Sequence, residues 1–227
     1  MRVSTIAERV GAVRQQVADA CRRAGRSPED VTIVAVTKGF PPEAVRDGFA
    51  AGLSHFGENR VQEAQAKLPL LAGLAPRPTW HMVGHLQTNK VKTALSLFDI
   101  IQSVDSLHLA QEISRRAPQS VRVPVLLEVN VTGEAAKYGF SPAELPPAAA
   151  QVRALPCIEV RGLMTVAPMA ADPEQARPVF RRLRELGASL GLAELSMGMT
   201  DDFPVAVEEG ATIVRVGRAI FGERSQP

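Results

Sequence analysis

The feature that most constrains the fold is an alternation of short apolar runs with longer amphipathic segments along the whole chain. Such runs are typical of strands buried in a parallel sheet, each followed by a helix that covers it. About eight βα units in a chain of 227 residues favour a (β/α)8 barrel. The expected strands are VTIVAV (31–36), LSHFG (53–57), TWHMVG (79–84), FDIIQSV (98–104), VPVLLEVNV (123–131), IEVRGLMTV (158–166), LSMGM (195–199) and TIVRVG (212–217).

An extra helix is expected before the first strand, because Val3, Ile6, Val10 and the apolar residues after them recur at helical spacing until Gly25. An open, doubly wound sheet is the alternative architecture, but no GxGxxG or Walker A loop follows the first strand. No stretch has the composition of a linker, so residues 1–227 are expected to form one domain. Further helices are expected near 42–51, 59–71, 88–96, 106–116, 142–154, 173–190 and 202–208.

Composition excludes several classes of function. The 26 basic and 24 acidic residues nearly cancel, and the basic clusters have no aromatic residues among them, which argues against a nucleic-acid partner. Cys21 and Cys157 are too few and too far apart for a disulfide framework or a CxxC metal site, so no metal is expected and both thiols are interpreted as structural. Because the N-terminal segment has no long apolar run, we expect a cytoplasmic protein.

The carboxyl ends of the strands are where a barrel of this kind places its chemistry. Ser196, Gly198 and Thr200 lie where the seventh strand passes into a helix, and Gly217 and Arg218 form a turn after the eighth. Each segment alone could be a helix cap or a tight turn. Two such loops after strands seven and eight, where barrels bind phosphate, together favour a phosphate site.

Lys38 ends the first strand of this predicted barrel. A lysine in that position is ordinarily solvated and inert. A partly desolvated amine, however, has a lowered pKa and attacks carbonyl groups to form a Schiff base. A ligand with both a carbonyl and a phosphate would suit Lys38 and the phosphate loops, and pyridoxal 5′-phosphate (PLP) is the evident candidate.

Arg215 interrupts the apolar run TIVRVG, and a buried guanidinium group needs an acceptor. An unprotonated pyridine nitrogen would be one, and the permanent charge of arginine would keep that nitrogen unprotonated. The alternative is an ion pair with Glu208, Glu209 or another carboxylate.

Seven motifs follow one another along the chain: VAVTK, FGENRVQE, WHMVGHLQTNK, VNVTGEAAKYGF, RGLMTV, LSMGMTDD and VRVGRAIFG. In this order they resemble those of the pyridoxal phosphate homeostasis proteins. The resemblance implies a fold-type III (β/α)8 barrel, similar to the N-terminal domain of bacterial alanine racemase, with PLP as a Schiff base on Lys38. The protein would hold PLP in the cell and supply or buffer it for PLP-dependent apo-enzymes.

The same resemblance implies the roles of individual residues. Asn59 would lie beside the cofactor ring, Met164 against its face and Arg215 at the pyridine nitrogen, with His81 near the site in an undefined role. The phosphate would be held by Ser196, Thr200 and the backbone amides of Gly217 and Arg218, with Gly198 in the same loop. Small departures are Thr37 and Thr200, where serine is commoner, and Arg60, where tyrosine is common.

A carrier is favoured over an enzyme, because a racemase with this barrel needs a second base from a separate C-terminal domain. The chain continues for only five residues after IFG and has one tyrosine, Tyr138. We therefore expect a monomer without catalytic residues. A PLP-dependent racemase or lyase of low activity is the alternative, and a binding protein for another phosphorylated aldehyde is a third possibility. Glu134 and Lys137 match the family pattern but have no assigned role.

Overall fold

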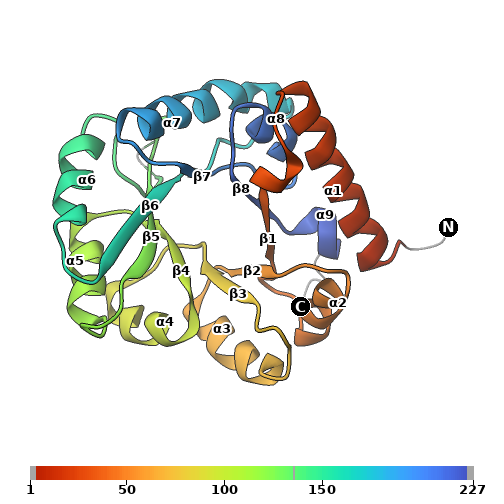
Figure 1. The fold of residues 1–227 in the computed structure, drawn as a ribbon, viewed down its shortest axis with the longest axis horizontal. Coiled ribbons are helices and arrows are strands. Elements are labelled where there is room, and N and C mark those ends of the chain that lie inside the picture. Colours follow the sequence, from red (N-terminus) through yellow and green to blue (C-terminus); the bar gives the residue numbers. More distant parts are fainter. Residues whose placement is uncertain (1–3, 135, 224–227) are drawn as a thin grey trace.

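The strands close into a parallel barrel in the computed structural model, which describes residues 4–134 and 136–223. Helices surround the barrel on the outside (Figure 1). The first and last strands pair, with Val34 opposite Arg215, so the barrel is confirmed and the open sheet is excluded. The strands are β1 (Thr32–Val36), β2 (His55–Glu58), β3 (Thr79–Met82), β4 (Ile100–Val104), β5 (Val123–Glu128), β6 (Ile158–Met164), β7 (Glu194–Ser196) and β8 (Ile213–Val216).

The expected N-terminal helix is present as α1 and packs against α8 and α9 (Figure 1). It begins with a capping box, in which Thr5 and Glu8 each accept a hydrogen bond from the other's backbone amide. Among the described residues, no helix is long and apolar enough to cross a membrane. The helices are α1 (Ile6–Arg23), α2 (Pro42–Ala50), α3 (Val61–Lys67), α4 (Val91–Leu97), α5 (Leu107–Arg116), α6 (Leu145–Arg153), α7 (Arg177–Ser189), α8 (Phe203–Glu208) and α9 (Arg218–Phe221).

Two segments near the carboxyl ends of β7 and β8 differ from the sequence-based expectation. Strand β7 ends at Ser196 rather than at 199, because Gly198 turns the chain with a φ of 91°. A Cβ atom at Gly198 would lie 2.5 Å from the Cβ of Ala206, so only glycine fits this turn. The segment after β8, interpreted as a tight turn, contains the short helix α9.

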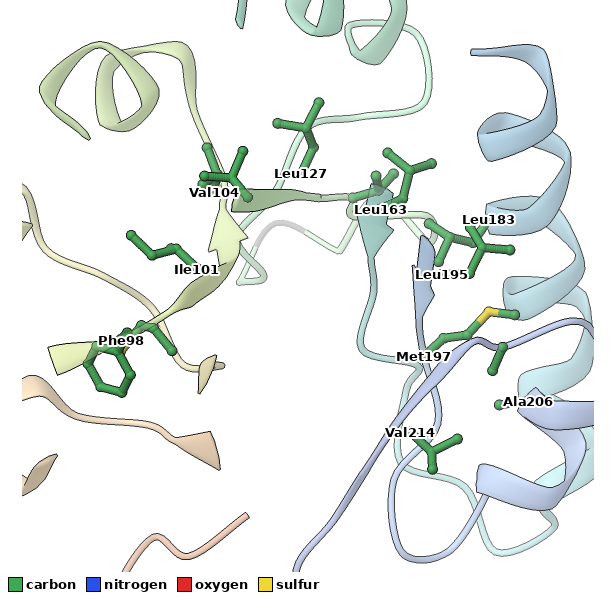
Figure 2. Close-up of a cluster of buried hydrophobic side chains, with 14 of the residues drawn as sticks. Phe98, Ile101, Val104, Leu127, Leu163, Leu183, Leu195, Met197, Ala206 and Val214 are labelled. Atoms are coloured by element: carbon green, nitrogen blue, oxygen red, sulfur yellow. The ribbon is translucent and has the colours of Figure 1, made fainter. Parts of the chain in front are cut away.

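The apolar core lies between the strands and the helices, where outward-facing strand residues meet the helix faces. Leu163 and Leu195 belong to the same cluster as Leu183 of α7 (Figure 2). Burying a leucine side chain contributes about 1.5–3 kcal/mol. The barrel interior has a much smaller apolar cluster, formed by Val34, Leu126, Met164 and Ile213 with Val83 against it. Polar side chains also lie inside the barrel, and they belong to the candidate site.

Candidate functional site

Lys38 lies at the carboxyl end of β1, where the preceding residue is held to β2 by a 2.9 Å hydrogen bond from the Thr37 amide to the Gly57 carbonyl. Its side chain is half-buried and lines a cavity of about 280 Å³ with Asn59, Arg60 and others. A second cavity, of about 510 Å³, also contains Asn59 and Arg60 and continues to His85 and Lys90. The structure therefore brings Lys38 and Asn59 together at one edge of the barrel mouth.

The loops after β7 and β8 meet next to the end of β1. The barrel register pairs Ala35 with Val216, so Gly217 follows directly beside Val36. A Cβ atom at Gly217 would lie 3.1 Å from the Val36 carbonyl oxygen, which explains why the smallest residue stands there. The hydroxyl of Thr200 accepts a 3.4 Å hydrogen bond from the amide of Ala219. The predicted phosphate residues Thr200 and Gly217 are thus neighbours of the strand that carries Lys38.

Arg218 begins α9, and its side chain is half-exposed. The guanidinium group donates a 2.7 Å hydrogen bond to Asp201 in the loop after β7. Because the side chain is held by this ion pair, the part of Arg218 that can face the barrel mouth is its backbone.

Arg215 is buried within β8, and its guanidinium group donates to two neutral acceptors. Nη1 donates to the hydroxyl oxygen of Ser196 at 2.6 Å, and Nη2 donates to the Thr165 carbonyl at 2.8 Å. Burial lowers the pKa of Arg215 to about 10, although the charges of Glu128 and Asp202 oppose this shift. Among the described residues, these two carboxylates act on the guanidinium group through their charge and not through a hydrogen bond.

The alternative partners of Arg215 are occupied elsewhere. Glu208 pairs with Arg23 at 2.6 Å, and Glu209 pairs with Arg181 at 2.8 Å, both outside the barrel wall. The ion pair of Arg215 with Glu208 or Glu209 is therefore absent, and the buried charge remains without a bonded carboxylate.

A row of hydrogen-bonded side chains crosses the barrel interior from Arg215, and we name these five residues the interior chain. The Ser196 hydroxyl donates to the side-chain oxygen Oε1 of Gln102 at 2.6 Å, and the side-chain nitrogen Nε2 of Gln102 lies 2.8 Å from His81 Nδ1. His81 Nε2 in turn lies 3.0 Å from His55 Nδ1. The members are Arg215, Ser196, Gln102, His81 and His55, which come from β8, β7, β4, β3 and β2.

His81 is almost completely buried, and burial together with the neighbouring His55 lowers its pKa to about 3. The ring is therefore neutral at pH 7. A neutral ring has one donor and one acceptor nitrogen, so the Gln102 amide fixes Nδ1 as the acceptor and Nε2 as the donor. His81 thus links Gln102 to His55 within the interior chain, and its expected place near the cofactor stays a prediction.

The Ser196 hydroxyl is held on two sides. It donates to the side chain of Gln102, and its oxygen accepts from Arg215. Ser196 therefore orients Arg215, and its expected contact with a phosphate stays a prediction, as do those of Thr200 and the turn after β8.

Met164 ends β6 inside the barrel, where the register places it between Glu128 of β5 and Ser196 of β7. It is buried with Val34, Leu126 and Ile213. Its position provides an apolar surface next to the polar interior chain, as expected for a residue that contacts the face of a ring.

Glu128 lies at the end of β5, and sequence reasoning missed it. Burial and the neighbouring Asp105 raise its pKa to about 7, against the attraction of Arg215. It lines a cavity of about 210 Å³ together with Lys137 and Tyr138. The only signal in the sequence was an acidic residue within the apolar run VPVLLEVNV.

The loop after β5 carries the family residues without an assigned role. Lys137 Nζ donates to the Glu134 carboxylate at 2.7 Å, so these two residues form an ion pair with each other. The ring of Tyr138 is stacked on His85, with ring centroids 3.9 Å apart, and 57% of the residue is exposed. Asn130 folds the same loop by donating to the Glu134 carbonyl at 2.9 Å.

Comparison with known proteins places this barrel in one family. The family model of the alanine racemase N-terminal domain matches residues 9–225. A pyridoxal phosphate homeostasis protein of Aquifex aeolicus is 44% identical over 96% of this chain and 97% of the relative. One of Pseudomonas aeruginosa is 44% identical over 98% of this chain and 97% of the relative.

Solved structures agree with these sequence matches. A structure of PipY from Synechococcus elongatus with PLP bound is 40% identical, with a TM-score of 0.84 over 96% of this chain and all of PipY. An alanine racemase of Clostridium difficile is 14% identical, with a TM-score of 0.72 over 93% of this chain and 56% of the racemase, and shows the shared fold alone. The chain therefore belongs to the pyridoxal phosphate homeostasis proteins, whose barrel is that of the alanine racemase N-terminal domain.

Proposed function

We propose that this protein binds PLP covalently and reversibly through Lys38, and that it buffers the cofactor or delivers it to PLP-dependent apo-enzymes. The observation that carries the proposal is the buried guanidinium group of Arg215, which donates to neutral acceptors among the described residues and lies in the strand next to that of Lys38. A guanidinium group in this setting suits a neutral nitrogen acceptor such as an unprotonated pyridine.

The residues at the barrel mouth fit the other parts of this cofactor. The aldehyde of PLP supplies the electrophile when it is bound, and the Lys38 amine is the nucleophile, with water as the leaving group. Asn59 lines the cavity of Lys38 and would lie beside the ring. Met164 offers the apolar contact for the ring face, next to Ser196 and Arg215.

Backbone groups are the proposed ligands of the phosphate. A side chain at Gly198 would collide with Ala206, and one at Gly217 would crowd the Val36 carbonyl, so glycine stands in both turns. The amides of Gly217 and Arg218 and the hydroxyl of Thr200 would donate to the phosphate oxygens. Ser196, whose hydroxyl donates to Gln102 in this structure, would contribute to the phosphate site by orienting Arg215 or by turning its hydroxyl to the phosphate.

A carrier is supported over a racemase by two features of the chain. Proton exchange on an amino acid needs a second base opposite the lysine, but the single tyrosine, Tyr138, is exposed and stacked on His85. The charge of Arg215 would keep the pyridine nitrogen unprotonated, which weakens the ring as an electron sink. Both features favour holding the cofactor over using it.

Cofactor loading is tested by titrating the purified protein with PLP, following near-visible absorbance, reducing with borohydride and mapping the modified peptide. We expect the added mass on Lys38 and at least about a tenfold loss of affinity in Lys38→Ala. Lys90 and Lys137 line neighbouring cavities. An adduct on either lysine in Lys38→Ala would show that a second amine at the barrel mouth can react with PLP when Lys38 is absent. An adduct on either in the wild type, with Lys38 unmodified, would contradict the proposal.

The alternative functions are separated by two further measurements on the loaded protein. Transfer of PLP to an apo-enzyme, with recovery of that enzyme's activity, is expected of a carrier. Exchange of the α-hydrogen of alanine or serine in deuterated water would instead identify a racemase or lyase. A protein that takes up no PLP at all would leave only the role of binding another phosphorylated aldehyde.

The proposal extends to a single-domain monomer in the cytoplasm. The two cysteines are buried and free, which suits a reducing compartment. Light scattering coupled to size-exclusion chromatography checks the oligomeric state, and a dimer would contradict this part of the proposal.

A further inference from the structure

Next to Lys38, four residues form a cluster that we name the clamp: the buried Thr37, Glu58 and Lys67 and the partly exposed Glu63. Lys67 ends α3, and only 6% of its surface is exposed. Its ammonium group donates to Glu58 at 2.6 Å, to Glu63 at 2.9 Å and to the Thr37 carbonyl at 2.8 Å. All three N–H groups of the ammonium are therefore used.

The clamp holds the chain on both sides of Lys38. Before the lysine, the Thr37 carbonyl accepts from Lys67, and the Thr37 hydroxyl donates to Glu58 at 2.6 Å. After the lysine, the Gly39 amide donates to Glu63, also at 2.6 Å. Successive side chains of an extended segment point to opposite faces, so Thr37 contacts the clamp from the side opposite Lys38, while Glu63 lines the same cavity as Lys38.

Lys67 also offsets part of the charge of two carboxylates, of which Glu63 lines the same cavity as Lys38. Burial raises the pKa of Glu58, while Lys67 and Thr37 lower it. One carboxylate oxygen of Glu58 is buried without a hydrogen-bond partner among the described residues. A cluster with a purely structural role would be more stable without this unpaired buried oxygen. Without Lys67, the negative charges next to Lys38 would be uncompensated.

Other charged groups near Lys38 come from two directions. Arg60 lines the same cavity as Lys38, so its positive charge, like that of Lys67, disfavours the ammonium form of Lys38. On the side of β8, Arg218 and Asp201 form an ion pair whose charges cancel. Lys67 is the buried cation that bonds both carboxylates of the clamp.

We propose that Lys67 is a positioning residue for Lys38: it fixes the backbone on both sides of the reactive lysine and offsets part of the negative charge of Glu58 and Glu63, so that this charge holds the Lys38 amine less strongly in its ammonium form. The consequence for cofactor binding rests on the proposed function. The effect on the Lys38 amine does not, and it can be measured without cofactor.

The experiment measures the reactivity of each lysine by competitive labelling with trace acetic anhydride between pH 6 and 11, followed by peptide mass mapping, on the full chain without PLP. The variants are Lys67→Met, which removes the charge, Lys67→Arg, which retains it, and Glu63→Gln, which removes one carboxylate. Lys92→Met is the matched control, because Lys92 is an exposed lysine of α4 outside the clamp. Circular dichroism reports whether each variant is folded.

We expect the labelling midpoint of Lys38 to rise by about one pH unit in Lys67→Met, because uncompensated carboxylates favour the ammonium form. The midpoint should fall in Glu63→Gln, return most of the way in Lys67→Arg and stay unchanged in Lys92→Met. The rate of PLP uptake at pH 7.5 should drop about tenfold in Lys67→Met.

Unchanged Lys38 midpoints in folded Lys67→Met and Glu63→Gln would overturn the inference and leave the clamp as a structural cluster. If Lys67→Met does not fold, Glu63→Gln and Lys67→Arg decide the question, since the first predicts a lower midpoint and the second a nearly normal one. A wild-type protein that takes up no PLP on Lys38 would instead refute the proposed function, while the labelling midpoints would still decide the role of Lys67.

Discussion

Two buried polar networks flank the reactive lysine, and they handle charge in opposite ways. In the interior chain, Arg215 carries a positive charge, and the residues hydrogen-bonded in a row from Ser196 to His55 are neutral. The clamp instead packs Lys67 between Glu58 and Glu63. A charge with only neutral partners remains available to a ligand, whereas a paired charge is already satisfied. The difference indicates that the interior chain serves cofactor recognition and that the clamp serves the backbone of Lys38.

The largest expected effect comes from breaking the clamp. Lys67→Met should lower the free energy of unfolding by about 3–5 kcal/mol, because Glu58 would remain buried without its partner. Replacing both members, as Glu58→Leu with Lys67→Met, should recover most of that loss. Denaturant unfolding of the two single variants and the double variant gives the coupling energy. Additive losses would show that the two side chains do not act as a pair.

The second effect tests the interior chain at its middle. Gln102→Leu leaves the hydrogen of the Ser196 hydroxyl and His81 Nδ1 without partners, at a cost of about 2–4 kcal/mol. Because Gln102 then no longer orients the Ser196 hydroxyl that accepts from Arg215, PLP affinity should fall as well. Ser103→Ala on the same strand is the matched control, since it removes a single hydrogen bond to the Gly84 carbonyl. Equal PLP affinity in both variants would show that the interior chain does not contribute to cofactor binding.

A smaller effect concerns the pH dependence of stability near Arg215. The folded state raises the pKa of Glu128 from an ordinary value of 4.5 to about 7, so between these values the folded protein holds a proton that the unfolded chain has lost. Stability from this group therefore falls as the pH rises through that window, by about 1–3 kcal/mol. Glu128→Gln should melt higher than the wild type at pH 8 and similarly at pH 4.5. A stability difference that is independent of pH would contradict this assignment.

The smallest effect is expected at the surface ion pair beside the phosphate turn. Asp201→Asn removes the partner of the Arg218 side chain but leaves the backbone amides in place, so stability should change by no more than about 0.5 kcal/mol. PLP affinity should stay within about twofold. A large loss of affinity, measured by the same absorbance titration, would show that the side chain of Arg218 and not its backbone contacts the phosphate.

The order of strands and helices could be predicted from the sequence, because parallel strands are buried on both faces and appear as apolar runs. Lys38 and the loops of Thr200 and Gly217 could be found for a related reason: strand ends are visible in the sequence, and a barrel brings them together. The end of β7 was misplaced because the turn depends on the backbone of Gly198.

The two networks could not be predicted. Gln102 and Glu58 lie within ordinary strand segments, and which face of the barrel each residue takes is fixed only when neighbouring strands pair in register. The contact of Ser196 with Gln102 was out of reach for the same reason, since Gln102 is distant in the sequence and comes from another strand. Glu63 and Lys67 are four residues apart on α3, as in many surface ion pairs. The burial of Lys67 became visible only in the fold.

The most direct test of the account is a crystal structure of the protein loaded with PLP. We predict a covalent bond from Lys38 Nζ to the cofactor, a guanidinium nitrogen of Arg215 within about 3 Å of the pyridine nitrogen, and the Ser196 hydroxyl still donating to Gln102. A cofactor bound at another lysine, or a pyridine nitrogen that faces a carboxylate instead of Arg215, would contradict the central claim.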